Sequence, residues 1–102
     1  MKKNINLLKY GGKNNMYYIV VYDFEIKKVN KALKLFRRYL HWVQNSVFEG
    51  ELTESQFEKL KQSCKELIDP NNDSVIFYSL SNKQWLNREI YGKDKNQINN
   101  FI

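Results

Sequence analysis

The chain has 102 residues, of which 42% are hydrophobic and 15% aromatic, which is enough for one domain with a packed core. Its only cysteine, Cys64, cannot form an internal disulfide, and no apolar run is long enough for a signal peptide or a membrane span, so we expect a soluble, cytoplasmic protein. The net charge of +6 is unevenly distributed, because residues 1–15 hold four of the 17 basic residues and no acidic one.

Residues 1–15 are rich in Asn and Lys and show no helical or strand periodicity, which predicts a disordered leader. The pair Gly11-Gly12 can be encoded by purine-rich codons that resemble a ribosome-binding sequence, and Met16 follows at a suitable distance. We therefore expect the natural start at Met16, a folded domain over 16–92 and a flexible tail over 93–102.

The first predicted element is a strand over 17–23, YYIVVYD, that is apolar on both faces. Tyr17, Ile19 and Val21 share one face, and the residues between them share the other. A strand with one face in water would alternate polar and apolar residues, so this strand is expected to be covered on both sides. Asp23 follows where the strand leaves the core.

An amphipathic helix is predicted over 26–40, because apolar residues recur there at steps of three and four. They are Ile26, Val29, Leu33, Phe36 and Leu40. The other side of the helix is basic: Lys27, Lys28, Lys31, Lys34, Arg37 and Arg38. No acidic residue of this helix could pair with them, so the face is either simply solvated or contacts phosphates, and the pattern leaves both interpretations open.

Two short antiparallel strands joined by a tight turn or bulge are predicted over 42–52. A second helix then begins, with Thr53 as N-cap and Gln56 as its capping-box partner. Cys64 lies on the apolar face of this helix, where we expect a small buried hydrophobic residue and not a nucleophile.

Turn residues over 69–73 end the second helix, and the segment 75–80 is again apolar on both strand faces. A short edge strand is predicted over 88–91. The order of strand, helix, strand, strand, helix, strand is that of a ferredoxin-like α+β fold, with both helices on one face of the sheet. Because the central strands are apolar on both faces, we expect a homodimer in which two sheets face each other.

The usual catalytic constellations are mostly missing from this sequence. It has one histidine, His41, for which a structural role is expected, and no phosphate-binding GxxxxGK motif. Asp23 has two open interpretations. It could complement the dipole of the following helix together with Glu25, or two copies of Asp23, brought together by a dimer, could bind Mg²⁺ with water and phosphate oxygens.

Three segments resemble the CRISPR-associated protein two (Cas-two) family, the small partner of the Cas-one integrase in spacer acquisition. They are MYYIVVYD at 16–23, HWVQNSVFEGELT at 41–53 and DSVIFYSL at 73–80, in the order and spacing of that family. The closing REIYG also looks like members of this family, and the resemblance spans residue 16 to about residue 92.

The resemblance implies a ferredoxin-like homodimer that bridges two integrase dimers and holds double-stranded DNA along its basic surface. Family members are described as Mg²⁺-dependent nucleases in which the aspartate ending the first strand binds the metal, and that position is Asp23. The polar and aromatic motif after the first helix falls on Ser46 and Phe48, which gives a candidate catalytic set of Asp23, Ser46 and Phe48. Packing for Phe48 and turn capping for Ser46 are equally open.

We expect an adaptor whose homodimer binds DNA phosphates without reading sequence. The expected contacts are Lys27, Lys31, Lys34, Arg37 and Arg38. A Mg²⁺-dependent endonuclease that requires Asp23 is the second hypothesis, and a toxin-type metal-dependent endoribonuclease is a third, from the same fold. A single-strand RNA-binding module is disfavoured, because residues 46–52 lack the aromatic-glycine signature of such modules.

Overall fold

The computed structural model describes residues 15–92. Apart from Asn15, the expected leader lies outside these residues, as does the expected tail over 93–102. The elements are β1 (Met16–Asp23), α2 (Ile26–Arg37), β2 (His41–Gln44), β3 (Val47–Leu52), α3 (Glu54–Leu67), β4 (Ser74–Leu80) and the short 3₁₀ turn η1 (Lys83–Trp85). This order confirms the predicted α+β fold.

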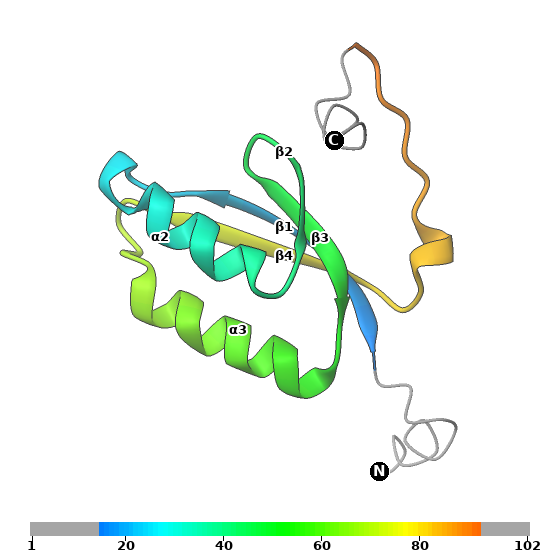
Figure 1. The fold of residues 1–102 in the computed structure, drawn as a ribbon, viewed down its shortest axis with the longest axis horizontal. Helices are drawn as coiled ribbons and strands as arrows, with labels where there is room; N and C mark the ends of the chain where they lie inside the picture. Colours follow the sequence, from blue (N-terminus) through cyan, green and yellow to red (C-terminus); the bar gives the residue numbers. More distant parts are fainter. Residues whose placement is uncertain (1–14, 93–102) are drawn as a thin grey trace.

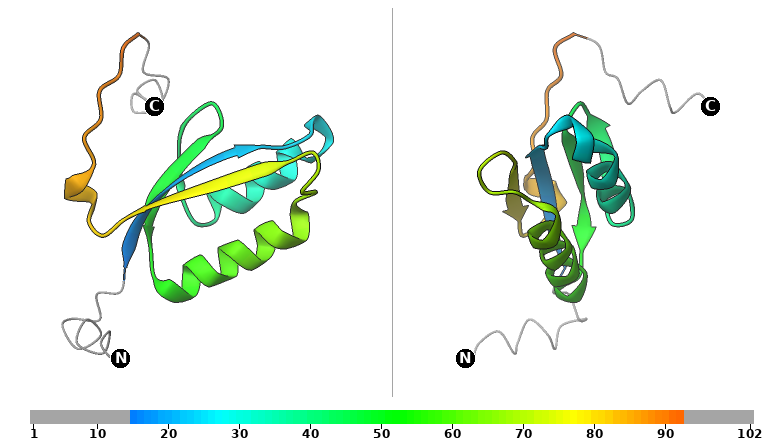
Figure 2. Two further views of the ribbon diagram at one scale, coloured as in Figure 1. Left: turned by 180° about the vertical axis from the view of Figure 1, so that it is seen from behind. Right: turned by 90° about the vertical axis from the view of Figure 1, so that its left-hand side faces the viewer.

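The four strands form one antiparallel sheet in the order β2-β3-β1-β4. Strand β1 is central, and its Val20 lies opposite Phe48 of β3 and Phe77 of β4. Helices α2 and α3 both pack on one face of the sheet (Figures 1 and 2). This two-layer arrangement is the ferredoxin-like architecture that the element order predicts.

The core lies between the sheet and the two helices. Its largest fully buried side chains are Val20, Phe36, Phe48, Leu52 and Leu60. The Tyr22 ring joins them from β1, with its centroid 5.1 Å from that of Phe36. The fold is therefore stabilised mainly by aromatic and aliphatic burial on the helix side of β1 and β3.

Helix α2 differs from the predicted helix in its length and in one core residue. It ends at Arg37, and Leu40 is buried in the turn that follows. Ile26 was expected in the core but is 93% exposed, because it begins the helix directly after the turn that leaves β1, at the margin of the layer. Ala32 and Leu35 are buried beside Phe36 instead.

The predicted start of the second helix is confirmed at atomic detail. The Thr53 hydroxyl accepts a hydrogen bond from the Gln56 backbone N–H at 3.1 Å, and the Gln56 side chain accepts one from the Thr53 N–H at 2.9 Å. This is the capping box that the sequence indicates. Further along α3, burial raises the pKa of the Cys64 thiol to about 11, so the thiol stays protonated at neutral pH, as a packing residue would.

The hairpin predicted over 42–52 is also confirmed, with Asn45 and Ser46 as its turn. Asn45 adopts a positive φ of 45°, which asparagine tolerates better than most residues. The register shifts between Trp42 and Gln44, which marks a bulge. The Trp42 indole N–H donates to the Asn45 carbonyl oxygen at 3.1 Å, so the ring is tied to the turn.

The segment after β4 differs from the prediction. Residues 86–91 form no strand, so the edge strand expected over 88–91 is wrong for the described part of the chain. The Arg88 guanidinium forms an ion pair with Glu49 of β3, and the Lys83 ammonium lies 5.8 Å from the centre of the Tyr17 ring. Tyr17 and Glu49 lie on the face of the sheet away from the helices. The segment after β4 therefore contacts that face through side chains and does not pair with an edge strand.

The face of the sheet away from the helices, which we call the open face, carries apolar side chains from three strands. They are Ile19, Val21, Val47, Ile76 and Tyr78. Neither α2 nor α3 covers this face (Figure 2). Lys83 of η1 and Arg88 cover one end of it at Tyr17 and Glu49, whereas Ile76 and Tyr78 are 46% and 55% exposed. The helices cover one face of β1, as expected, whereas the expected cover for its other face stays a prediction.

Candidate functional site

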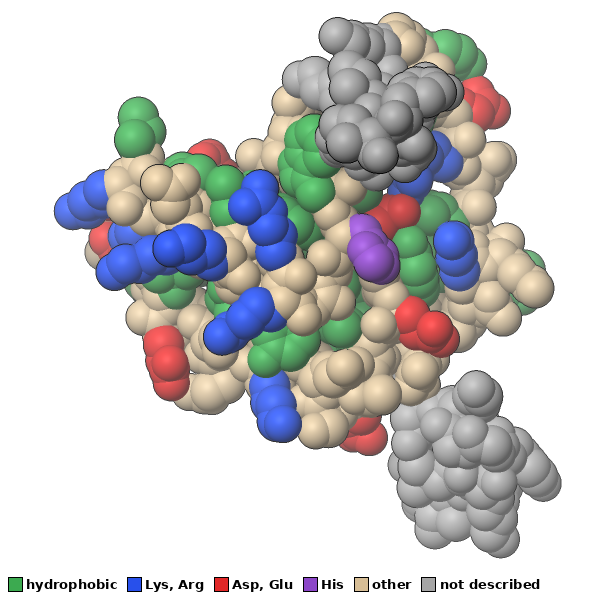
Figure 3. All heavy atoms as spheres, viewed as in Figure 1, with side chains coloured by type: hydrophobic (Ala, Val, Ile, Leu, Met, Phe, Trp, Pro, Cys, Tyr) green, Lys and Arg blue, Asp and Glu red, His purple; other side chains and the backbone are tan. Residues whose placement is uncertain are grey.

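The outer side of α2 carries a cluster of cations that point into solvent. We call Lys27, Lys31, Lys34, Arg37 and Arg38 the basic face of α2; all five are exposed. Figure 3 shows Lys and Arg side chains gathered over this helix. The Lys27 ammonium lies 3.9 Å from a Glu25 carboxylate oxygen, whereas within residues 15–92 no carboxylate lies within 4 Å of the other four cations.

A shallow hollow of about 570 Å³ is lined by Lys31, Lys34, Leu35, Arg37 and Arg38 on this helix. Because four of these five side chains are cationic and none is neutralised by the described protein, the hollow attracts anions. Side chains spaced along one helix suit a repeated anion such as a phosphate backbone better than a single small ion.

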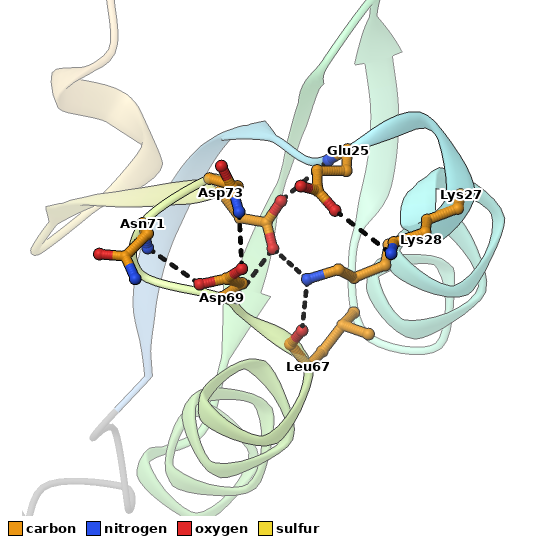
Figure 4. A network of polar contacts seen from close by, with 8 residues as sticks. Glu25, Lys27, Lys28, Leu67, Asp69, Asn71 and Asp73 are labelled. Carbon is orange, nitrogen blue, oxygen red and sulfur yellow. Dashed lines mark hydrogen bonds and ion pairs between the residues drawn. The ribbon is translucent and has the colours of Figure 1, made fainter.

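Lys28 was grouped with the basic residues of the helix, but the structure gives it a different role. Its ammonium lies 2.5 Å from an Asp73 carboxylate oxygen and 3.5 Å from the Leu67 carbonyl oxygen (Figure 4). The Lys28 side chain is only 17% exposed. It ties α2 to the segment after α3 and is not available to bind a ligand.

Asp73 is the centre of this network, and its side chain is fully buried. Besides Lys28, it accepts hydrogen bonds from the backbone N–H groups of Glu25 at 2.9 Å and Asp69 at 2.8 Å (Figure 4). Burial alone would raise the pKa of Asp73, but these three donors outweigh it and hold the pKa at about 2. The same contact with Asp73 raises the pKa of Lys28.

This network fixes the turn that carries Asp23. Glu25, two residues after Asp23, donates its backbone N–H to Asp73. Asp23 itself lies opposite Ser74, the residue after Asp73, in the β1–β4 ladder. Apart from its place in a turn, Asp73 has no local pattern that predicts this role, because its partner Glu25 is 48 residues away in the chain.

Asp23 is exposed at the end of β1 and lines a second hollow of about 590 Å³. The hollow lies between α2 and the tip of the β2–β3 hairpin, and we call it the Trp42 hollow. Its lining residues are Tyr22, Asp23, Phe24, Val29, Leu33, Arg37, Trp42, Asn45 and Ser46. The structure thus brings together Asp23, Ser46 and Arg37 from the expected site.

Ser46 contacts β1 through both its backbone and its side chain. Its carbonyl oxygen accepts a hydrogen bond from the Tyr22 N–H at 3.1 Å, and its side chain lies near the Tyr22 hydroxyl. Burial raises the pKa of Tyr22, while the nearby Arg37 charge and the Ser46 side chain act in the opposite direction. Ser46 is therefore held beside Tyr22 at the edge of the hollow.

Phe48 occupies a different place from the other expected site residues. It is fully buried, with its ring centroid 5.6 Å from Phe36 and 6.0 Å from Tyr22. It is not among the residues that line the Trp42 hollow. These contacts favour the packing role for Phe48, and a catalytic role stays a prediction.

Of the residues that line the Trp42 hollow, Asp23 alone offers a metal ion a carboxylate. Within the described part of the chain, no three His, Cys, Asp or Glu side chains gather closely enough to hold a metal ion. Mg²⁺ is commonly bound by one or two carboxylates together with water and phosphate oxygens. Asp23 fits as one such ligand, and a full protein site would need a carboxylate from elsewhere.

His41, the only histidine, is exposed on β2 opposite Glu49 of β3. It does not line the Trp42 hollow.

Among the described helices, none is long and apolar enough to cross a bilayer.

The sheet order, the two helices on one face and the acidic end of β1 beside a basic helix define a ferredoxin-like α+β domain with a charged site at one end. A family model described as CRISPR associated protein Cas2 matches residues 16–88. The chain belongs to this family.

Curated relatives carry the same family name. A protein of Thermococcus kodakarensis named CRISPR-associated endoribonuclease Cas2 is 49% identical over 87 residues, which cover 85% of this chain and 100% of that one. A protein of Thermotoga maritima with the same name is 49% identical over 82 residues, covering 80% of this chain and 94% of that one.

Solved structures agree with this assignment. A crystal structure described as that of cas2 superposes with a TM-score of 0.75 at 42% identity, covering 79% of this chain and 91% of that one. The structure of Streptococcus pyogenes Cas2 gives a TM-score of 0.67 at 32% identity, covering 74% of this chain and 99% of that one.

Proposed function

We propose that the protein is a cytoplasmic CRISPR adaptation protein that binds double-stranded DNA as a homodimer and bridges two dimers of the Cas-one integrase during spacer acquisition. The observation that carries the proposal is the basic face of α2, where Lys31, Lys34, Arg37 and Arg38 have no carboxylate partner in the described chain. Membership of the Cas2 family supports it.

The dimensions of the basic face suit a duplex. Lys27 and Arg38 are eleven residues apart on one helical stretch, which corresponds to about 17 Å at 1.5 Å per residue. This length matches about five base pairs at 3.4 Å each. Lys and Arg contacts to phosphates release counterions and position a duplex without reading its sequence.

The homodimer is proposed because the open face is apolar and, within residues 15–92, is covered only at the end where Lys83 and Arg88 contact it. Exposed Ile76 and Tyr78 lie on it beside Ile19 and Val21. A second copy would cover this face with the same side chains, as a two-fold interface requires. The two sheets would then face each other, with one basic helix on the outer side of each copy.

Asp23 is proposed as a Mg²⁺ ligand and as the catalytic carboxylate of an endonuclease. It is exposed at the last position of β1, where it shares strand parity with Ile19 and Val21 of the open face and also lines the Trp42 hollow. Two copies meeting through this face would supply two Asp23 carboxylates. Bound Mg²⁺ would stabilise charge on a phosphodiester during hydrolysis, while Arg37 and Ser46 line the same hollow and are placed to orient the substrate.

The adaptor role is tested by duplex binding of Lys31→Glu/Lys34→Glu, compared with Asp23→Ala and with Lys59→Glu/Lys65→Glu on α3. Lys59 and Lys65 are exposed, so this control reverses the same number of charges on the other helix. We expect duplex binding to be lost only when α2 is changed. Duplex binding that survives charge reversal on α2 would remove the adaptor proposal.

A toxin-type metal-dependent endoribonuclease is the second candidate, and it is favoured by the name that the relatives carry, CRISPR-associated endoribonuclease Cas2. The distinguishing assay is cleavage of labelled single-stranded RNA and duplex DNA with Mg²⁺, by the unmodified protein and by Asp23→Ala. RNA cleavage that requires Asp23, without DNA cleavage, would support this candidate. Equal cleavage by the unmodified protein and Asp23→Ala would show that Asp23 is not catalytic for RNA or for DNA cleavage.

A further inference from the structure

The Trp42 hollow combines an apolar wall with a charged rim. Val29 and Leu33 of α2 are only partly buried and face the hollow together with Trp42 of β2, while Asp23 and Arg37 bring charges of opposite sign. Its volume of about 590 Å³ lies within the range of roughly 300–1,000 Å³ that is typical of small-ligand sites. A wall of this kind suits a flat, apolar ring.

The Trp42 ring is held in place before any ligand arrives. Its indole N–H donates to the Asn45 carbonyl oxygen at 3.1 Å, within the same hairpin tip. A side chain that is already ordered loses little rotamer freedom when a ligand packs on it. Trp42 is therefore preorganised as one wall of a site.

Arg37 connects this hollow with the basic face of α2. It lines the Trp42 hollow, and it also lines the cationic hollow together with Lys31, Lys34 and Arg38. A nucleic-acid strand whose phosphates lie along α2 would therefore pass Arg37 and reach the mouth of the Trp42 hollow. The phosphate charge of such a strand is complementary to Arg37, and its flat bases could pack against the apolar wall at Trp42.

We propose that the Trp42 hollow binds one unstacked base of a single-stranded nucleic acid, with Trp42 as the stacking residue and Arg37 on an adjoining phosphate. This inference rests on the proposed binding of nucleic acid along α2, and it adds a base-binding subsite beside Asp23. Bases inside a duplex are stacked on their neighbours and cannot enter. The subsite therefore selects unpaired nucleotides next to the candidate catalytic carboxylate.

The test uses Trp85→Phe, which leaves Trp42 as the only tryptophan, since the chain has two. Its fluorescence is titrated, in EDTA, with a single-stranded DNA hexamer, a single-stranded RNA hexamer, a fully abasic hexamer and a DNA duplex. We expect saturable quenching by the DNA hexamer, the RNA hexamer or both, and none by the abasic strand or the duplex. Quenching by one hexamer alone identifies the sugar that the subsite accepts.

A second measurement compares the binding of a labelled hexamer by Trp42→Ala and by Trp85→Ala, since Trp85 is 72% exposed and does not line the hollow. Loss of one stacked base should weaken binding about 5- to 150-fold for Trp42→Ala only.

Equal quenching by the hexamers and the abasic strand, or no quenching at all, would overturn the subsite. If the same protein samples still bind the duplex, the proposed DNA binding along α2 stands without the base-binding subsite. Loss of duplex binding in the unmodified protein would instead mark failure of the proposed function.

Discussion

Neutralising two cations of the basic face should reduce the salt dependence of duplex binding by a calculable amount. The change is Lys31→Gln/Lys34→Gln, because both side chains are exposed, line the cationic hollow and have no carboxylate within 4 Å in the described chain. Glutamine keeps a polar side chain on the helix surface, so the fold should not change.

The magnitude follows from counterion release. Each phosphate contact contributes about −0.9 to the slope of log K against log salt concentration. Losing two contacts should make the slope less steep by about 1.8 for each protomer that binds. Raising KCl from 50 to 200 mM weakens duplex binding by both proteins. With one bound protomer, the factor by which binding weakens should be about twelve-fold smaller for the variant than for the unmodified protein.

The assay is fluorescence anisotropy of a labelled duplex at four or more salt concentrations over that range. Lys59→Gln/Lys65→Gln on α3 is the matched control, since it removes the same charge at exposed positions and should leave the slope unchanged. Equal slopes for all three proteins, or equal reductions in both variants, would refute a localised phosphate-binding face and leave only a general effect of net charge.

Three further predictions concern the packing and hydrogen bonds that stabilise the fold. Phe48→Ala should lower the free energy of unfolding by about 3–5 kcal/mol, measured by urea denaturation, because Phe48 is fully buried; loss of cleavage at unchanged stability would instead show a catalytic role. Asp73→Asn should lower the urea midpoint at neutral pH. The pKa of Asp73 is about 2, below its ordinary 3.8, so its stabilisation is present above about pH 4 and is lost as the pH falls towards 2. The urea midpoint of Asp73→Asn should lack the fall between about pH 4 and 2 that this carboxylate causes. Parallel plots of urea midpoint against pH for the variant and the unmodified protein would contradict the network. Thr53→Ala should cost about 1 kcal/mol of stability, whereas Thr53→Ser should cost little, and equal losses would contradict the capping box.

The fold could be predicted from the sequence because its signals are local. The capping box at Thr53 and Gln56 spans four residues, and the two-faced apolar pattern of 17–23 lies within one strand. Each signal specifies an element without knowledge of distant parts of the chain. Their order then restricts the topology to few arrangements.

Ile26 and the segment 88–91 show where local patterns fail. The spacing of Ile26 fits the apolar face of α2, but no periodicity indicates that the first turn of the helix lies at the margin of the sheet. Residues 88–91 have strand-like composition, but the position of Arg88 depends on Glu49, which is 39 residues away. Both differences are set by tertiary contacts.

The candidate site was only partly predictable for the same reason. Asp23 and the basic face could be found from residue type and spacing, whereas Lys28 could be separated from the other cations only through its contact with buried Asp73. The Trp42 hollow joins β1, α2 and the hairpin tip, and no single stretch of sequence contains it.

The homodimer is the central claim, because both the bridge between integrase dimers and a Mg²⁺ site with two Asp23 carboxylates require a second copy. The direct test is the mass of the purified protein by light scattering at micromolar concentration. We predict twice the chain mass of 12.3 kDa, and a return to the single-chain mass in Tyr78→Arg, which places a charge on the open face. A single-chain mass for the unmodified protein would contradict the account.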